Sequence, residues 1–170
     1  SLRPHVIPGA DIDGGSIAAA AQSSWDKVMA LNRVDATKIM VLGGQRMLLD
    51  ALEQKKLSGV IGLGGANGTS IACAIMRALP PLLPKIMVSP VAATAAVQWY
   101  VAESDIAMFS SIGDISMNRI TSAVLRNAAE AVAAMARIWT SPEKSTNRLA
   151  PLVGVSTFGV TEKCVHRVSE

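Results

Sequence analysis

Short apolar runs alternate along the chain with stretches whose apolar residues recur every three or four positions. The segment 58–63 is a short apolar run, and from Thr69 onward the spacing becomes three to four. The first pattern is typical of a buried strand and the second of an amphipathic helix. We therefore predict a strand over 58–63 and a helix from Thr69, which the prolines at 80, 81 and 84 end.

The same alternation continues toward the carboxyl end. Further strands are predicted over 85–89, 105–110 and 152–156. Asn118 is expected to cap a long Ala-rich helix, whose apolar face comprises Ile120, Val124, Leu125, Ala128, Val132, Met135 and Ile138. Strands that alternate with helices indicate an α/β fold with a mostly parallel sheet between two helix layers.

The amino-terminal third is less regular. Residues 1–15 are expected to form a loop, Ser16 to cap a short helix and Ser24 a second one. Residues 35–56 fit two interpretations: a strand over 38–42 followed by a Gly-Gly turn, or a long helix capped by Asp35. The paired glycines cost about 1 kcal/mol each inside a helix, so the residues alone leave both interpretations open.

Two long stretches, 57–76 and 86–102, carry no charge. Their lengths approach the ~20 apolar residues of a membrane span. Both contain glycine, proline or hydroxyl residues at their centres, which a lipid-facing helix does not favour. We therefore expect no membrane span, and interpret these stretches as parts of a parallel sheet buried on both faces.

Composition narrows the choice of partners and compartment. Half of the residues are hydrophobic, which excludes a disordered chain. The formal charge is +3 and the basic residues are scattered, so the sequence does not indicate nucleic-acid binding. The two cysteines, Cys73 and Cys164, stand alone, which favours a reducing, cytoplasmic location without a disulfide framework. Because the chain starts at Ser1, we expect it to be a fragment of a longer protein.

The main chemical signal is a glycine-rich segment between the first predicted strand and its helix. Glycines allow close approach of a ligand, and free N–H groups at a helix start favour an anion. The candidate phosphate-binding residues are Gly62, Gly64, Gly65, Asn67, Gly68, Thr69 and Ser70. Their spacing fits neither the dinucleotide fingerprint nor the P-loop, and a tight turn without a ligand is the alternative.

A second group of polar residues flanks the predicted strand at 105–110. Ser104 and Asp105 lie at its start, Ser110 and Ser111 lie at its end, and Asp114, Asn118 and Arg119 follow. These side chains could bind ribose or a metal, whereas helix capping is the commoner use of Asp114 and Asn118. An arginine at a helix start opposes the helix dipole, which suggests that Arg119 faces a carboxylate or a ligand. No histidine or cysteine spacing predicts a metal site, and no motif indicates nucleophilic hydrolysis.

Several blocks together resemble one family. They read GVIGLGGANGTSIACAIMRALP, PKIMVSPVA, YVAESDIAMFSSIGDISMNRI, LRNAAEAVAAMA and PLVGVSTFGVT. Over about residues 10–166 the chain is similar to the amino-terminal half of the tomato mosaic virus resistance protein-like ATP-binding family. The resemblance implies a Rossmann-like first domain over 1–140 that lacks its opening strand. It also implies a linker over 141–148 and, over 149–170, the first strand and helix start of a second Rossmann-like domain.

The resemblance also implies that residues 35–55 form a helix and that the ligand is a nucleotide, ATP first. Ala66 and Asn67 replace the usual Ser-Gly of the family's loop, and asparagine adopts a positive φ more readily than most residues, so a similar turn is possible there. Ser89, Ser104 and Asp105, at neighbouring strand ends, are expected to complete the site.

Three functions follow from these patterns. The first is a nucleotide- or phosphate-binding domain. The second is an enzyme acting on a phosphorylated metabolite, completed by a further domain. The third is an interaction scaffold that dimerises through the helix 118–139 and Trp99-Tyr100. The expected partners are a second copy of the chain and the remainder of the full-length protein.

Overall fold

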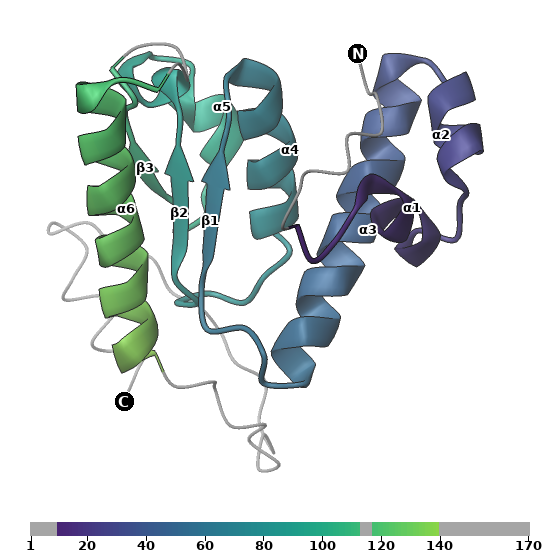
Figure 1. The fold of residues 1–170 in the computed structure, drawn as a ribbon, viewed down its shortest axis with the longest axis horizontal. Helices are drawn as coiled ribbons and strands as arrows, with labels where there is room; N and C mark the ends of the chain where they lie inside the picture. Colours follow the sequence, from purple (N-terminus) through teal and green to yellow (C-terminus); the bar gives the residue numbers. More distant parts are fainter. Residues whose placement is uncertain (1–9, 113–116, 140–170) are drawn as a thin grey trace, which may run out of the picture.

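The computed structural model describes residues 10–112 and 117–139, in which helices cover both faces of a parallel sheet (Figure 1). The strands are β1 (Val60–Leu63), β2 (Lys85–Val88) and β3 (Ala107–Phe109), in the order β1-β2-β3. In register, Ile61 pairs with Ile86, and Met87 pairs with Met108. The predicted α/β fold with a parallel sheet is confirmed. The linker at 141–148, the segment 149–170 and Asp114 lie outside the described residues.

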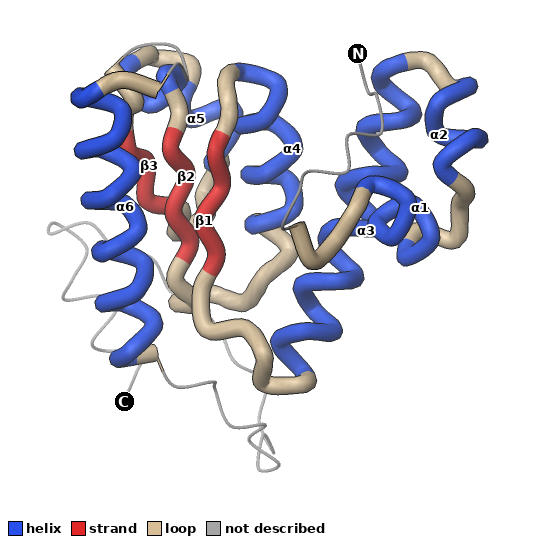
Figure 2. Tube along the Cα trace, viewed as in Figure 1, coloured by secondary structure: helices blue, strands red, loops and turns tan. Residues whose placement is uncertain are grey.

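Two helices form the outer layers of this sheet, as Figure 2 shows. On one face, α4 (Ala66–Met76) packs Cys73 and Met76 against Met87 of β2. On the other face, α6 (Arg119–Ile138) packs Ala128 against Ile86 and Val88. Successive β2 residues point to opposite faces and all four are buried, which explains the continuous apolar run in the sequence.

The amino-terminal helices lie to one side of this sandwich. They are α1 (Gly14–Ala20), α2 (Trp25–Ala30) and α3 (Arg33–Glu53), and α3 runs beside α4 (Figure 1). The helical interpretation of the ambiguous segment is therefore confirmed. The cap is Asn32, whose Oδ1 accepts the Asp35 N–H at 3.0 Å, rather than Asp35 itself. Asp13, not Ser16, caps α1, whereas Ser24 caps α2 as expected.

The remaining elements connect β2 to β3 and then to α6. The short helices η1 (Pro90–Ala93) and α5 (Val97–Val101) follow β2. Asn118 caps α6, as predicted, by accepting the N–H groups of Ile120 and Thr121. The middle of the predicted apolar face of α6 packs on the sheet, but its ends do not: Ile120 is 56% exposed and Ile138 80%.

Two findings bear on the surroundings of the chain. Across residues 10–112 and 117–139, none of the helices has both the length and the apolar character that crossing a bilayer requires. Cys73 is buried in the core, and its burial raises the pKa of the thiol. The cytoplasmic location stays a prediction.

Candidate functional site

The glycine-rich segment is shorter than its sequence suggests, because α4 begins at Ala66, three residues before the predicted start at Thr69. Gly65 is the N-cap residue, with φ −71° and ψ −165°. Asn67 lies in the first helical turn and has no positive φ, so the turn does not use the left-handed conformation that asparagine tolerates. The turn between β1 and α4 therefore consists of Gly64 and Gly65. Ala66 already belongs to the helix, which agrees with the strong helix propensity of alanine.

The first turn of α4 keeps open hydrogen-bond donors. The N–H of Gly64 donates to the Val88 carbonyl at 3.2 Å, and that of Thr69 donates to the Gly65 carbonyl at 2.8 Å. Among the described residues, no acceptor lies within hydrogen-bond reach of the N–H groups at 66–68, and no side chain caps the helix. These amides sit at the positive end of the helix dipole, where an anion is stabilised.

The hydroxyls of Thr69 and Ser89 are not available to a ligand. Both residues are fully buried, and their oxygens lie 2.6 Å apart. Thr69 Oγ1 also lies 2.9 Å from the Gly65 carbonyl, and Ser89 Oγ accepts the Val91 N–H at 3.0 Å. The Thr69–Ser89 hydrogen bond connects the first turn of α4 to the start of η1.

The glycines of the turn have different roles. A Cβ at Gly62 would lie 2.7 Å from Met87 Sδ, and one at Gly64 would lie 2.7 Å from the Cα of Gly68. These glycines allow close packing inside the protein. A Cβ at Gly65, in contrast, would meet nothing within 4 Å, so Gly65 borders open space beside the free amides.

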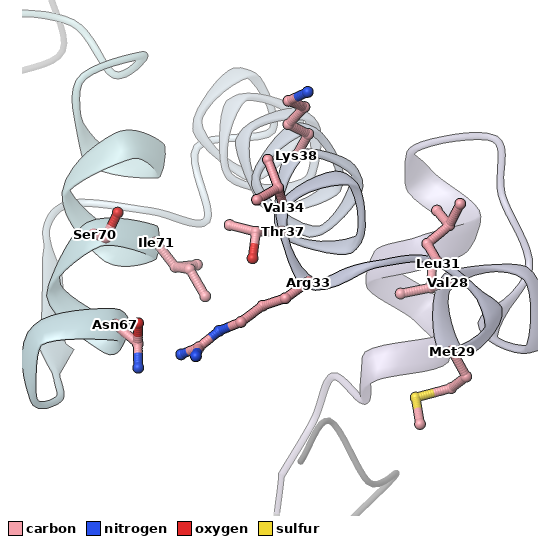
Figure 3. A pocket seen from close by; sticks show the side chains of 10 residues that line it. All are labelled: Val28, Met29, Leu31, Arg33, Val34, Thr37, Lys38, Asn67, Ser70 and Ile71. Carbon is pink, nitrogen blue, oxygen red and sulfur yellow. The ribbon is translucent and has the colours of Figure 1, made fainter.

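A cavity of about 790 Å³ lies between the amino-terminal helices and α4 (Figure 3). Three helices supply its lining: Val28, Met29 and Leu31 belong to α2 or its end, Arg33, Val34, Thr37 and Lys38 to α3, and Asn67, Ser70 and Ile71 to α4. Of the predicted site residues, the cavity therefore includes Asn67 and Ser70. Its other polar side chains come from α3, which the sequence did not link to the glycine-rich segment.

Arg33 is a candidate site residue that the sequence patterns did not single out. Its guanidinium points across the cavity toward Asn67 (Figure 3). It is exposed, and within the described ranges it has no hydrogen-bond or ion-pair partner, whereas Lys38 pairs with Asp35 at 2.9 Å. Arg33 occupies the first position of α3, where a cation opposes the helix dipole. This was the same signal that drew attention to Arg119, and it could have identified Arg33.

Ser104 and Asp105 are not brought to the glycine turn, which corrects the expectation that they complete the site. They precede β3, so a parallel sheet places them at the edge opposite to the turn that follows β1. Ser110 and Ser111 follow β3 and lie at the correct edge, where the Ser111 N–H donates to the Ser89 carbonyl at 3.4 Å. Polar residues flank both ends of β3, but only its carboxyl end lies at the same edge as the turn after β1.

Asp105 instead forms a structural ion pair. Its Oδ1 lies 2.9 Å from the Lys85 Nζ, and its Oδ2 accepts the Leu82 N–H at 2.6 Å. Burial acts to raise the pKa of the Asp105 carboxyl, but the Lys85 and Leu82 hydrogen bonds and the Lys85 charge together lower it below its usual value. Ser104 Oγ donates to the Val101 carbonyl at 2.6 Å.

These observations define the protein as an α/β domain of Rossmann-like architecture with a cavity beside the helix that follows β1. The chain belongs to the family described as the uncharacterised protein family (UPF0261) N-terminal domain, whose model matches residues 1–141. Within the described residues, no cluster of three or more His, Cys, Asp or Glu side chains could hold a metal.

Relatives include bacterial and plant proteins. UPF0261 protein RA0729 of Rhizobium meliloti is 37% identical over 99% of this chain and 40% of its own length. The UPF0261 protein of Clostridium tetani is 38% identical over the same shares. The ToMV resistance protein Tm-1(GCR237) of Solanum lycopersicum is 39% identical over 79% of this chain and 18% of its own length. The chain thus spans about 40% of the length of the bacterial relatives.

Proposed function

We propose that this domain binds a phosphate-containing ligand, with a nucleotide such as ATP as the first candidate, in the cavity between α3 and α4. The observation that carries the proposal is the unpaired Arg33 guanidinium, which points toward the helix turn whose 66–68 amides lack acceptors. A guanidinium and helix N–H groups are both strong phosphate donors. The apolar lining from Val34 and Ile71 would contact the rest of the ligand.

The residues predicted to bind phosphate fall into two groups, those that border the cavity and those that stabilise the turn. Asn67 and Ser70 line the cavity, and Gly65 borders the open amides. Thr69 and Ser89 act by holding the turn, because their hydroxyls are bonded to each other. An enzymatic role on a phosphorylated metabolite would need reactive groups from elsewhere, since the lining within the described residues has no carboxylate, histidine or cysteine.

Replacing Gly65 tests the proposal without disturbing the fold. A side chain at this position enters open space, so the Gly65→Val variant should fold, with a melting temperature lowered by a few degrees because valine is a poorer N-cap residue than glycine. It should weaken ATP binding roughly tenfold or more, because the isopropyl group crowds anions at the helix start. Isothermal titration calorimetry on the full-length protein, with ATP up to millimolar concentration, measures both affinities. Unchanged binding in the variant, or no binding by the wild type, would contradict the proposal.

A homodimer is a second proposal, supported by the exposure of apolar side chains. Trp99 on α5 is 86% exposed and Ile138 on α6 is 80% exposed. Their helices cover opposite faces of the sheet, so the proposal places the contact at Trp99 alone, since aromatic side chains are enriched at interfaces. We expect light scattering to give twice the monomer mass for the full-length protein and the monomer mass for Trp99→Ser. Leu82→Ser, which removes another side chain exposed at 80%, serves as the control that stays dimeric. A monomeric wild type would remove this proposal.

A further inference from the structure

The cavity between α2, α3 and α4 combines two cations with no acidic side chain. Arg33 and Lys38 line it, and among the described lining residues there is neither Asp nor Glu. Asn67 and Ser70 come from the first two turns of α4, so the positive end of that helix dipole adds to the same charge. The side chain of Asp35 neutralises part of the Lys38 charge, which leaves Arg33 as the unpaired cation.

This lining is poorly suited to a magnesium–nucleotide complex. Protein sites for Mg²⁺-bound phosphates supply one or two carboxylates to the cation. In P-loops the hydroxyl that follows the glycine loop also reaches the metal. The spacing here does not match a P-loop, and the hydroxyl directly after the glycines, Thr69 Oγ1, is buried and bonded to Ser89 and to the Gly65 carbonyl. Among the described lining residues, the side-chain oxygens that could bind a cation belong to Thr37, Asn67 and Ser70, and all three are neutral.

On the basis of the proposed function, we infer that the cavity takes its phosphate ester as the metal-free anion, and that Mg²⁺ competes with Arg33 for the phosphate oxygens. A guanidinium donates two parallel hydrogen bonds to phosphate oxygens. Mg²⁺ occupies the same oxygens and brings two positive charges toward the cations of the cavity, without a lining carboxylate to offset them. The magnesium complex therefore binds more weakly than the free nucleotide.

The affinity of the full-length protein for ATP, measured by calorimetry with EDTA and with excess MgCl₂ at equal ionic strength, tests this inference. We expect roughly tenfold weaker binding with Mg²⁺, corresponding to the loss of one charge-assisted contact. The single phosphate of AMP binds Mg²⁺ weakly, so the affinity for AMP should be nearly the same with EDTA and with MgCl₂. Equal ionic strength is essential because salt alone screens exposed charges.

Substitutions locate the effect at Arg33. Arg33→Met should weaken ATP binding in EDTA and remove most of the Mg²⁺ dependence, whereas Arg33→Lys should keep part of both. Arg126→Met, on the exposed face of α6, is the matched control and should behave as the wild type. Tighter ATP binding with Mg²⁺ would overturn the inference and leave the proposed function standing. Absence of ATP and AMP binding under both conditions would overturn the proposed function itself.

Discussion

We expect the Gly43→Ala variant to lose about 3 kcal/mol of unfolding free energy, because a methyl group at this position has no space. A Cβ at Gly43 would lie 1.9 Å from the carbonyl oxygen of Ile17 on α1. That atom belongs to a helix backbone, so relief requires α1 to move away from α3. Since α1 packs Ala18 against Ala36 of α3, the movement would open the core of the amino-terminal helices. Urea denaturation followed by circular dichroism measures the loss.

The neighbouring glycine provides the control. A Cβ at Gly44 would approach Ile75 Cδ1 at 2.6 Å, and this atom is the end of a flexible side chain. Rotation of Ile75 relieves the contact, while alanine gains about 1 kcal/mol of helix propensity over glycine. We expect Gly44→Ala to stay within about 1 kcal/mol of the wild type. Equal losses in the two variants would show that α1 does not pack on α3 as described.

The second large effect is expected at Lys85. This side chain is 1% exposed, and its ammonium group donates to the Pro80 carbonyl at 2.8 Å and to the Leu83 carbonyl at 3.0 Å besides pairing with Asp105. Lys85→Met leaves these acceptors without a donor. The Asp105 side chain is 41% exposed, so the loss comes mainly from the two carbonyl acceptors and is expected to be about 2 kcal/mol, which chemical denaturation would measure.

Lys38→Met is the matched comparison for this pair. Lys38 and Asp35 also lie 2.9 Å apart, but the Lys38 side chain is 72% exposed. Exposed pairs contribute little, so we expect a change of about 0.5 kcal/mol or less. A Lys85→Met variant as stable as Lys38→Met would show that burial does not strengthen the Lys85 contacts.

The Lys85–Asp105 pair should also make stability depend on pH. The Asp105 pKa is lower in the folded protein than its ordinary value of 3.8. The unfolded chain therefore binds a proton first, and the stabilisation is fully present above that value and is lost as the pH falls through the lowered pKa. Acid titration of the wild type should show this loss, and Lys85→Met should show less of it.

Local sequence was sufficient for most of the fold. The apolar run of β2, the cap at Asn118 and the prolines after α4 each carry their own signal. The long helix α3 was decided by resemblance rather than by its residues, since its glycines argue against a helix. The structure explains these glycines, because Gly43 permits close contact with α1 and Gly44 with α4. Helix propensities describe an isolated helix and do not include the energy of such contacts.

What the sequence determined by itself was the α/β alternation and the glycine turn before α4, because strand, helix and turn preferences act over a few residues. Only the tertiary structure decided which side chains meet at that turn. Arg33 lies 34 positions before Asn67 in the chain, and packing of α3 beside α4 brings both to one cavity. Ser104 and Asp105 were assigned to the wrong edge because the direction of a strand in the sheet decides where its ends lie.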